Sequence, residues 1–460
     1  MAREKVSRTE IFEKMPVYKA ILSLAIPNIV NQLANVFYNL ADTFYIGRLN
    51  NSSMVAALTV TTSVMIFITA LSNLFCVGSC AVIASALGSK DEKKARDIAT
   101  MAPMMAFAAG LVVTIIVLCF RRQIALYSGA SETSLGYTMQ YQFWVLGLNA
   151  IPFLCATTIG AGLRGRGWSK YEMYGITFGN IVNIVLDPIF IFVFDLGVTG
   201  AAAATFIANV CSFAFFIVIA SRMQRKEHLY THLKEFRFNG KYALAVITTG
   251  FPACLHSMLA SVSNTIHLNI IKKYSDAAVA SLGIVRKIEH TFGQVIIGLV
   301  QGIIPLIAYN YAAKNYNRLQ EVRKKALVLT MLWACFSVAL LLPLARQFML
   351  LFIKDEATVV FGTPLVRIYA FLPFTMGYNN NTRTLLQALG RKKVSSTFSL
   401  IRQVLLYVPL MFLLDRLFGF YGTAFTPLVA DAITDVIGFF WVRKMMREIK
   451  AECEAPLQQG

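Results

Sequence analysis

Long apolar segments constrain this chain more than any other feature of its sequence. Each is about 18 residues or longer, enough to cross a bilayer as a helix, and only short polar stretches separate them. The 460 residues are 57% hydrophobic and 15% charged, with a mean hydropathy of +0.59. The sequence therefore predicts an all-α polytopic membrane protein with twelve transmembrane helices. The segments lie at 20–46, 54–86, 98–120, 137–161, 171–194, 198–221, 243–271, 279–312, 326–348, 361–388, 394–416 and 419–442.

The net charge of +19 is distributed unevenly along the chain. Most Lys and Arg residues fall in alternate loops, as in membrane proteins whose cytoplasmic loops carry an excess of these residues. We therefore expect a multi-pass protein of the plasma (inner) membrane with both termini in the cytoplasm. The bilayer, and not nucleic acid, is the expected partner of the basic loops. The basic stretches are 90–96, 222–241, 314–325, 391–393 and 443–450.

The cysteines of this chain are expected to pack as small side chains and not to bind a metal or form disulfides. Seven of the eight cysteines lie within apolar segments, as small buried residues do. The stretch "CVGSC" at 76–80 has neither the spacing nor the partners of a metal site. We expect no disulfide, no cofactor, no resident metal and no enzymatic activity. The charged residues 1–19 and the long apolar segment after them predict a membrane-spanning helix and not a cleaved signal peptide.

The chain also repeats itself at an offset of about 221–225 residues. Pro27 in "LAIPN" aligns with Pro252 in "TGFPA", and "VAALTV" at 55–60 aligns with "VASLGI" at 279–284. Six helices per repeat give two halves with the same orientation, an arrangement typical of transporters that rock one half against the other. A duplicated structural bundle without transport is the alternative. The predicted domains are a cytoplasmic segment 1–19, six-helix bundles 20–221 and 243–442, a cytoplasmic connector 222–242 and a cytoplasmic tail 443–460.

Polar side chains form a stripe along one face of several of the apolar helices. On the first helix they recur every three or four residues, so they share one face; they are Asn28, Asn31, Gln32, Asn35, Asn39 and Asp42. A thinner stripe on the seventh helix contains His256, Asn264 and His267. Intramembrane polar residues usually face the bundle interior or an aqueous cavity. For the second half, His267, Asn264, Glu289 and Gln301 are therefore candidates to line a cleft.

The fifth helix carries an acid in "GNIVNIVLDPIFIF". Asn180, Asn183 and Asp187 share one face, and Pro188 cannot donate a hydrogen bond to the carbonyl of Ile184. Broken backbone at membrane depth is tolerated where it lines a cavity. Asp187 and Asp42 are candidates to load and release a proton, although permanently bonded structural carboxylates are the alternative for both. Since both acids fall in the first half, we predict the ion-coupling site within residues 1–221.

The remaining intramembrane charges favour structural roles. Arg286, Lys287 and Glu289 are close enough along one helix to neutralise each other, whereas Arg402 has no obvious partner in the sequence. Intramembrane aromatic residues such as Tyr38 are assigned mainly to packing, and a few of them are candidates to present a ring face to a flat cation.

Several of these stretches resemble the multidrug and toxic compound extrusion (MATE) family of its bacterial type. They are "LADTFYIG" in the first helix, "GLRGRGWSK" after the fourth, "NIVLDPIFIF" in the fifth, "GVTGAAAAT" at the sixth and "GIVRKIEHTFGQ" in the eighth. The resemblance covers about residues 15–445. It implies two pseudo-symmetric six-helix bundles in a V shape and an antiporter that exports organic cations and drugs, including antibiotics, in exchange for H⁺ or Na⁺.

The resemblance also implies roles for individual residues. Asp42 and Asp187 match the ion-coupling acids of the family, and Pro27 matches a proline at which the first helix bends. Asn183, Tyr141 and Thr205 match the polar neighbours of that site, with nearby Tyr137 as the alternative to Tyr141. Asn180 and Asn39 are further candidate neighbours because they lie on the polar stripes that carry the two acids. A second-half sodium site would have acids on the seventh and tenth helices, where this chain offers His267, Asn264 and the acid-free "GYNNNTR". This favours protons, and Na⁺ at the two first-half acids stays open.

Other functions match the residues less well. A lipid-linked precursor flippase of the same superfamily needs several cations in its cleft to hold a pyrophosphate, and only Arg402 suggests one. An integral membrane enzyme needs a nucleophile or a metal cluster, which the sequence lacks. A monomer is expected.

Overall fold

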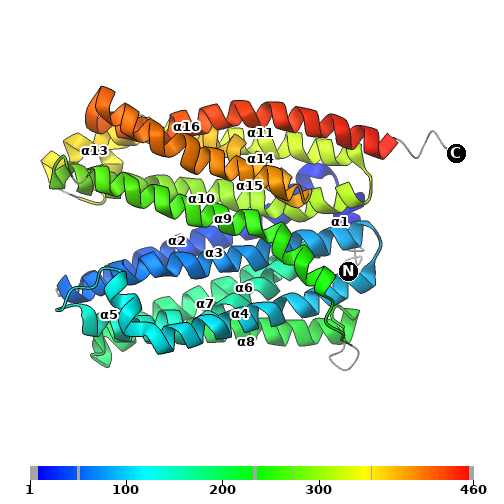
Figure 1. Ribbon diagram of the computed structural model, residues 1–460, viewed down its shortest axis with the longest axis horizontal. Coiled ribbons are helices and arrows are strands. Elements are labelled where there is room, and N and C mark those ends of the chain that lie inside the picture. The colour runs from blue at the N-terminus through cyan, green and yellow to red at the C-terminus, as the bar shows by residue number, and fades with distance from the viewer. Residues whose placement is uncertain (1–8, 49–51, 232–235, 272, 354, 455–460) are drawn as a thin grey trace, which may run out of the picture. The chain divides into compact units, whose positions relative to one another are not determined.

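The computed structural model describes residues 9–48, 52–231, 236–271, 273–353 and 355–454, and these ranges contain helices and no strands (Figure 1). Helices are the structure expected of separate apolar segments, because a bilayer core has no water to bond to backbone amides and carbonyls. In these ranges, ten helices are long and apolar enough to cross a membrane alone, and one bent pair brings the number to eleven.

The predicted twelfth span depends on one glycine. Lys392–Glu452 is assigned as a single 61-residue stretch, although a helix of that length would measure about three times the ~30 Å hydrocarbon core. Gly419 within it has φ 61° and ψ −144°, which is not helical. Figure 1 shows the chain reversing between the orange and red arms of this stretch. Length and composition alone therefore give ten or eleven spans, and a division at Gly419 would raise the number to the twelve that the sequence predicts.

The chain forms two compact units, unit 1 (residues 1–29 and 258–460) and unit 2 (residues 30–257). Unit 2 contains most of the first half of the sequence. Its helices are α3 (Ser52–Gly88), α4 (Glu92–Tyr127), α5 (Leu135–Gln142), η1 (Phe143–Leu148), α6 (Ala150–Gly165), α7 (Ser169–Pro188), η2 (Ile189–Val193) and α8 (Gly197–Glu227).

Unit 1 contains the short amino-terminal helix and most of the second half. Its helices are α1 (Thr9–Glu13), α10 (Asp276–Ala312), α11 (Tyr316–Leu341), α12 (Ala345–Leu350), α13 (Glu356–Tyr369), α14 (Leu372–Ala388), α15 (Lys392–Leu400), η3 (Ile401–Leu406) and α16 (Tyr407–Glu454).

Two helices are divided between the units. The first part of α2 (Val17–Gly47), up to Ile29, belongs to unit 1, and the first part of α9 (Gly240–Ile271), up to Ser257, belongs to unit 2. The compact units thus differ from the halves of the sequence repeat by an exchange of these two helix beginnings. The division of α2 falls two residues after Pro27, where the missing amide hydrogen weakens the helix.

Glycines explain why the beginning of α2 packs into unit 1. Gly298 and Gly302 on α10 form a small-xxx-small pair of the kind that lets helix backbones approach closely in membranes. A Cβ atom on Gly302 would lie 2.6 Å from Cα of Ala25, and one on Gly298 would lie 2.7 Å from Cα of Ile29.

The beginning of α9 packs into unit 2 in the same way. A Cβ atom on Gly250 would lie 1.8 Å from the carbonyl oxygen of Leu74, and one on Gly78 would lie 2.2 Å from that of Val246. Leu74 and Gly78 precede Gly298 and Gly302 by the offset of the repeat. The two close crossings are therefore counterparts.

The loops repeat as well. Lys90 and Lys314 both have positive φ, at 60° and 56°. The next residue in each case caps a helix: a side-chain oxygen of Asp91 accepts from the amide of Lys94 at 3.0 Å, and that of Asn315 accepts from the amide of Arg318 at 3.2 Å. Such caps bond amides that the helix itself leaves free.

The close crossing of α10 and α2 can be tested with alanine. Gly302→Ala places a methyl group against the backbone of α2, so we expect a loss of about 1–3 kcal/mol in the free energy of unfolding. Gly283→Ala on the same helix is the control, because nothing lies within 4 Å of its Cβ position; it should be neutral or slightly stabilising. Unfolding in detergent measures both, and equal stability of the two variants would contradict the packing.

Candidate functional site

Both predicted acids of the first half lie in unit 2 and are buried. Asp187, near the end of α7, has no exposed surface, and Asp42 on α2 is 7% exposed. The two carboxyl groups lie close enough to interact electrostatically. The structure therefore brings together two acids that lie 145 residues apart in the sequence.

The side-chain amide of Asn183 connects the acid on α7 to α8. Its Nδ2 donates to Oδ1 of Asp187 at 3.2 Å and to Oγ1 of Thr205 at 3.3 Å. The hydroxyl of Tyr38 on α2 lies 3.5 Å from the same Thr205 oxygen. Three helices thus contribute to one buried network.

The polar stripes of α2 and α7 meet beside this network. Nδ2 of Asn180 donates to Oδ1 of Asn35 at 2.9 Å. One turn further along α2, Nδ2 of Asn39 donates to the backbone carbonyl of Asn35 at 2.7 Å, so this amide faces its own helix.

Three oxygen atoms of the site are buried and have no hydrogen-bond partner among the described residues: Oδ1 of Asp42, Oδ2 of Asp187 and Oδ1 of Asn183. A buried acceptor without a donor is costly, by about 1–3 kcal/mol, and a buried uncompensated charge costs more. A proton or a small hard cation would satisfy such oxygens. Within the described ranges, no group of three or more His, Cys, Asp and Glu side chains could hold a metal ion.

The backbone beside Asp187 departs from a regular helix. Pro188 ends α7, and the five residues of η2 after it form a π-helix. Proline has no amide hydrogen to donate, and π-helical turns are frequent at functional sites. The acid therefore sits where the backbone hydrogen-bond ladder changes.

Tyr141 on α5 is 5% exposed and packs with Val145, Val198 and Ala202. It lies within electrostatic range of both acids and of Tyr38. Sequence reasoning assigns Tyr38 to packing, whereas the structure puts its hydroxyl in the network. Its position one helical turn before Asp42 is the signal that could have identified it.

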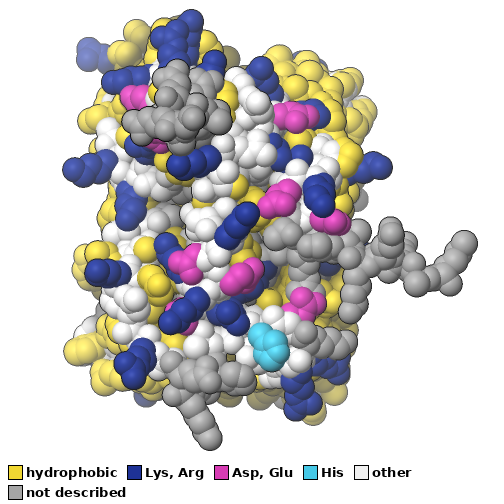
Figure 2. Space-filling view, turned by 90° about the vertical axis from the view of Figure 1, so that its right-hand side faces the viewer, with side chains coloured by type: hydrophobic (Ala, Val, Ile, Leu, Met, Phe, Trp, Pro, Cys, Tyr) yellow, Lys and Arg dark blue, Asp and Glu magenta, His cyan; other side chains and the backbone are white. Residues whose placement is uncertain are grey.

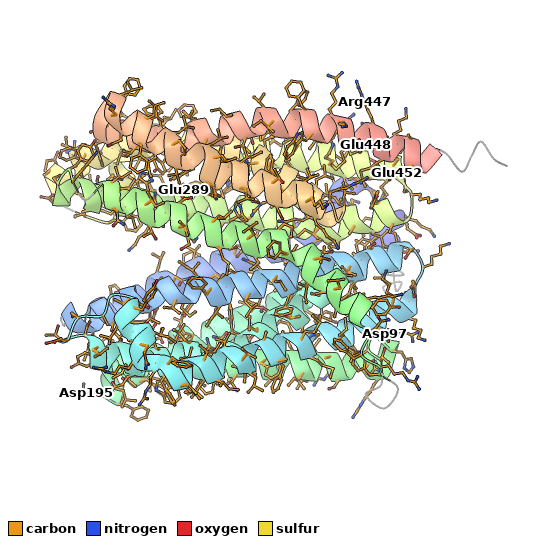
Figure 3. The ribbon with its side chains drawn as sticks, viewed as in Figure 1. Asp97, Asp195, Glu289, Arg447, Glu448 and Glu452 are labelled. Atoms are coloured by element: carbon orange, nitrogen blue, oxygen red, sulfur yellow. The ribbon has the colours of Figure 1, made fainter. Side chains whose placement is uncertain are left out.

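The second-half candidates do not gather at one site, and Glu289 instead lies within electrostatic range of Asp431, a buried acid of α16. His267 has no exposed surface; its Nδ1 lies 2.6 Å from a guanidinium nitrogen of Arg286 and 2.9 Å from the hydroxyl of Tyr407. Asn264 is exposed, and Gln301 is half-buried. Figure 3 places Glu289, also half-buried, midway along the long helices.

The structure adds partners to two intramembrane charges. Arg286 and Glu289 lie within electrostatic range of each other, although no ion pair within 4.0 Å joins them in the described part of the chain. A guanidinium nitrogen of Arg286 also lies 2.6 Å from Nδ1 of His267. Arg402, which lacks an evident partner in the sequence, forms a salt bridge with Asp431 on α16. The partners lie 19 and 29 residues away, too far for helical spacing to indicate them.

The network can be tested at its central hydroxyl. Thr205→Val keeps the side-chain shape but removes the oxygen shared by Asn183 and Tyr38, so we expect a loss of about 0.6–1.5 kcal/mol in the free energy of unfolding. Thr62→Val is the matched control, since that hydroxyl is exposed and bonds only to the Leu58 carbonyl of its own helix. If denaturant unfolding in detergent gave the same loss for both variants, the shared hydroxyl would contribute nothing specific.

The chain is similar to known proteins over nearly all its length. A family model described as MatE matches residues 27–189 and 252–413. Multidrug export protein MepA of Staphylococcus aureus (strain NCTC 8325 / PS 47) is 30% identical over 422 residues, which cover 92% of each chain. MepA of Staphylococcus haemolyticus (strain JCSC1435) is 28% identical over 442 residues, 96% of each chain.

Solved structures agree in fold. One, described as the outward-facing conformation of a multidrug resistance MATE family transporter of the MOP superfamily, has a TM-score of 0.92 at 21% identity, covering 97% of this chain and 100% of that one. A MOP superfamily transporter from Pyrococcus furiosus, whose binding pocket is described as having a reverse polarity that suggests a different function, has a TM-score of 0.89 at 21% identity, covering 98% and 100%.

Proposed function

Since this chain belongs to the MATE family of membrane transporters and is not an enzyme, we propose that it is a secondary active multidrug antiporter. It exports cationic amphipathic organic compounds in exchange for protons. The observation that carries the proposal is the pair of buried carboxyls, Asp42 and Asp187, with unpartnered oxygens beside an amide–hydroxyl network. The relatives named multidrug export protein support drugs as the substrates.

Energetics favour an exchange of cations. Moving one positive charge outward against about 100 mV costs about 2.3 kcal/mol, and one incoming proton cancels that electrical work. Each unit of pH difference then supplies about 1.4 kcal/mol. An antiporter of this kind therefore runs on the pH gradient alone when one monovalent drug leaves for each proton that enters.

The network suggests how protonation acts. In the ionised state, Asp187 accepts from Asn183 while its second oxygen lacks a donor. A protonated carboxyl becomes a donor, and the unpartnered Oδ1 of Asn183 is an available acceptor. We infer that ionised Asp42 and Asp187 favour drug binding and that protonation from outside, with a bend of α2 at Pro27, favours drug release.

Protons are preferred over sodium because a second-half sodium site would have acids on the seventh and tenth helices, and neither of these predicted helices has one. Sodium at Asp42 and Asp187 is the competing form of the same proposal. We propose that the protein is a monomer of the plasma membrane with both termini in the cytoplasm; the positions of its basic loops support this orientation.

The flippase alternative loses part of its support. It requires cations that can hold a pyrophosphate, and Arg402 is paired with Asp431. The observation that still favours it is that Arg383 lies within electrostatic range of Arg402, and that Arg286 and Arg402 both lie within range of Tyr407.

Transport in proteoliposomes tests the proposal. We expect Asp42→Asn and Asp187→Asn each to lower pH-driven efflux of an organic cation at least tenfold, because neither amide can gain and lose a proton. Asp195→Asn is the matched control: Asp195 lies in a loop after η2, at the end of unit 2 opposite to Asp97 (Figure 3), and its variant should transport normally.

The same vesicles can identify the ion that drives efflux. An imposed pH step should drive efflux, and a sodium step at constant pH should not. Wild-type efflux in either Asp→Asn variant would disprove the coupling role, whereas efflux driven only by sodium would replace the proton in the scheme.

A further inference from the structure

A basic groove lies in unit 1, far along the chain from the ion site. Its volume is about 240 Å³, and it lies between the start of α11 and the end of α16, with Tyr378 of α14 also contributing. Three arginines and a lysine line it, Arg323 from α11 and Arg443, Arg447 and Lys450 from α16. Figure 2 shows Lys and Arg side chains gathered on the face of the molecule where α11 begins and α16 ends.

The cations of α16 share one side of the helix with apolar residues. Arg443, Arg447 and Lys450 are spaced four and three residues apart, so they stand above one another. The same side of α16 continues toward the membrane interior with Val442 and Phe439. Phe439 is 50% exposed. The groove is therefore charged at its mouth and apolar at its inner end.

The arginines of the groove have no carboxylate partner in the described ranges. No salt bridge or hydrogen bond joins Arg323, Arg443 or Arg447 to an acid there, and Nε of Arg323 is buried without a hydrogen-bond acceptor. Of the acids nearby, Glu321 pairs with Lys325, while Asp435 lies within electrostatic range of Tyr378 and keeps Oδ1 without a hydrogen-bond partner. Glu452, labelled with Arg447 in Figure 3, pairs with Arg391 at 3.1 Å. The groove thus keeps an excess of positive charge.

The equivalent region of unit 2 is closed by the chain itself. After α8 ends at Glu227, Leu229 turns inward and is 5% exposed, and its carbonyl accepts from Arg166 at 3.0 Å. Thr231 then bonds to α4 through Asp97 at 2.6 Å and Thr100 at 2.9 Å. The connector therefore joins the end of α8 to α4. In the repeat, α8 corresponds to the end of α16 and α4 corresponds to α11. No described segment of unit 1 joins those two helices in this way.

We propose that the groove between α11 and α16 binds one anionic phospholipid of the adjoining leaflet, with its phosphodiester at Arg323, Arg443 and Arg447 and its acyl chains along Phe439. Basic pockets between helices on the cytoplasmic side of membrane proteins suit such headgroups, and guanidinium groups match phosphate oxygens in geometry. Tyr316 and Gln320 add neutral donors at the rim. The apolar inner end favours a lipid over a soluble phosphate.

Residues 455–460 are the competing occupant within this chain. Their sequence, "APLQQG", has no charged side chain, so a terminal carboxylate would be their single anion. A phospholipid supplies both a phosphodiester for the arginines and acyl chains for the apolar end of the groove.

Lipid binding to the purified full-length protein in detergent tests the proposal. The probe is fluorescent phosphatidylglycerol, with phosphatidylcholine of the same chains as reference. Arg323→Gln/Arg447→Gln removes one groove cation from each helix, and we expect about 30-fold weaker binding of phosphatidylglycerol, at about fivefold for each cation. Lys324→Gln/Lys444→Gln is the matched control, because both lysines are exposed neighbours outside the groove, and its binding should stay within about threefold of wild type.

Three outcomes would overturn the proposal. Equal losses in the two double variants would make the attraction a general effect of charge. Displacement of the lipid by inorganic phosphate at equal concentration would assign the groove to a soluble anion. Tighter binding, by tenfold or more, in a chain truncated after Glu454 would assign it to residues 455–460. If Arg323→Gln impairs folding, Arg443→Gln/Arg447→Gln repeats the comparison with two exposed side chains on one helix.

Discussion

A polar group inside a bilayer has no water to bond to, and this constraint decides which contacts the rest of the structure can make. Many polar groups among the described residues meet a partner: Arg402 forms a salt bridge with Asp431, and the amide of Asn183 donates to both Asp187 and Thr205. Others stay incomplete at several places in both units, and Asp42 and Asp187 each keep one such oxygen. Two neighbouring carboxyls with unpartnered oxygens are an arrangement suited to a transported cation.

Much of the helical architecture could be predicted from the sequence because many consecutive apolar residues mark each membrane-spanning segment. Every apolar segment has enough residues to cross the membrane, and even the reversal at Gly419 coincides with the predicted boundary between the last two segments. The offset of the repeat is equally redundant, since many pairs of residues support it. The two stretches matched by the MatE family model begin at Pro27 and Pro252, the same two prolines.

Side-chain partners could not be predicted in the same way. A stripe such as that of Asn35 and Asp42 indicates a face, but it does not indicate which helix lies opposite. The contact of Asn35 with Asn180 and the pairing of Arg286 with His267 depend on how helices pack, and packing is set by shapes summed over whole surfaces. Tyr38 shows the same limit: an aromatic ring on an apolar helix has a packing role by default, and only a neighbour such as Thr205 reveals the use of its hydroxyl.

The repeat also explains why the two halves differ at their ends. Joining two equal halves in one chain requires one connector, and here that connector begins by folding back over the end of α8 through Leu229 and Thr231. The second half has α16 in the place of α8, and no described segment makes the corresponding bridge from α16 to α11. Arg323, Arg443 and Arg447 lie in the groove between these two helices without a carboxylate partner among the described residues. The different paths of the chain at the two ends therefore explain why a basic groove is present in unit 1 and its counterpart in unit 2 is covered.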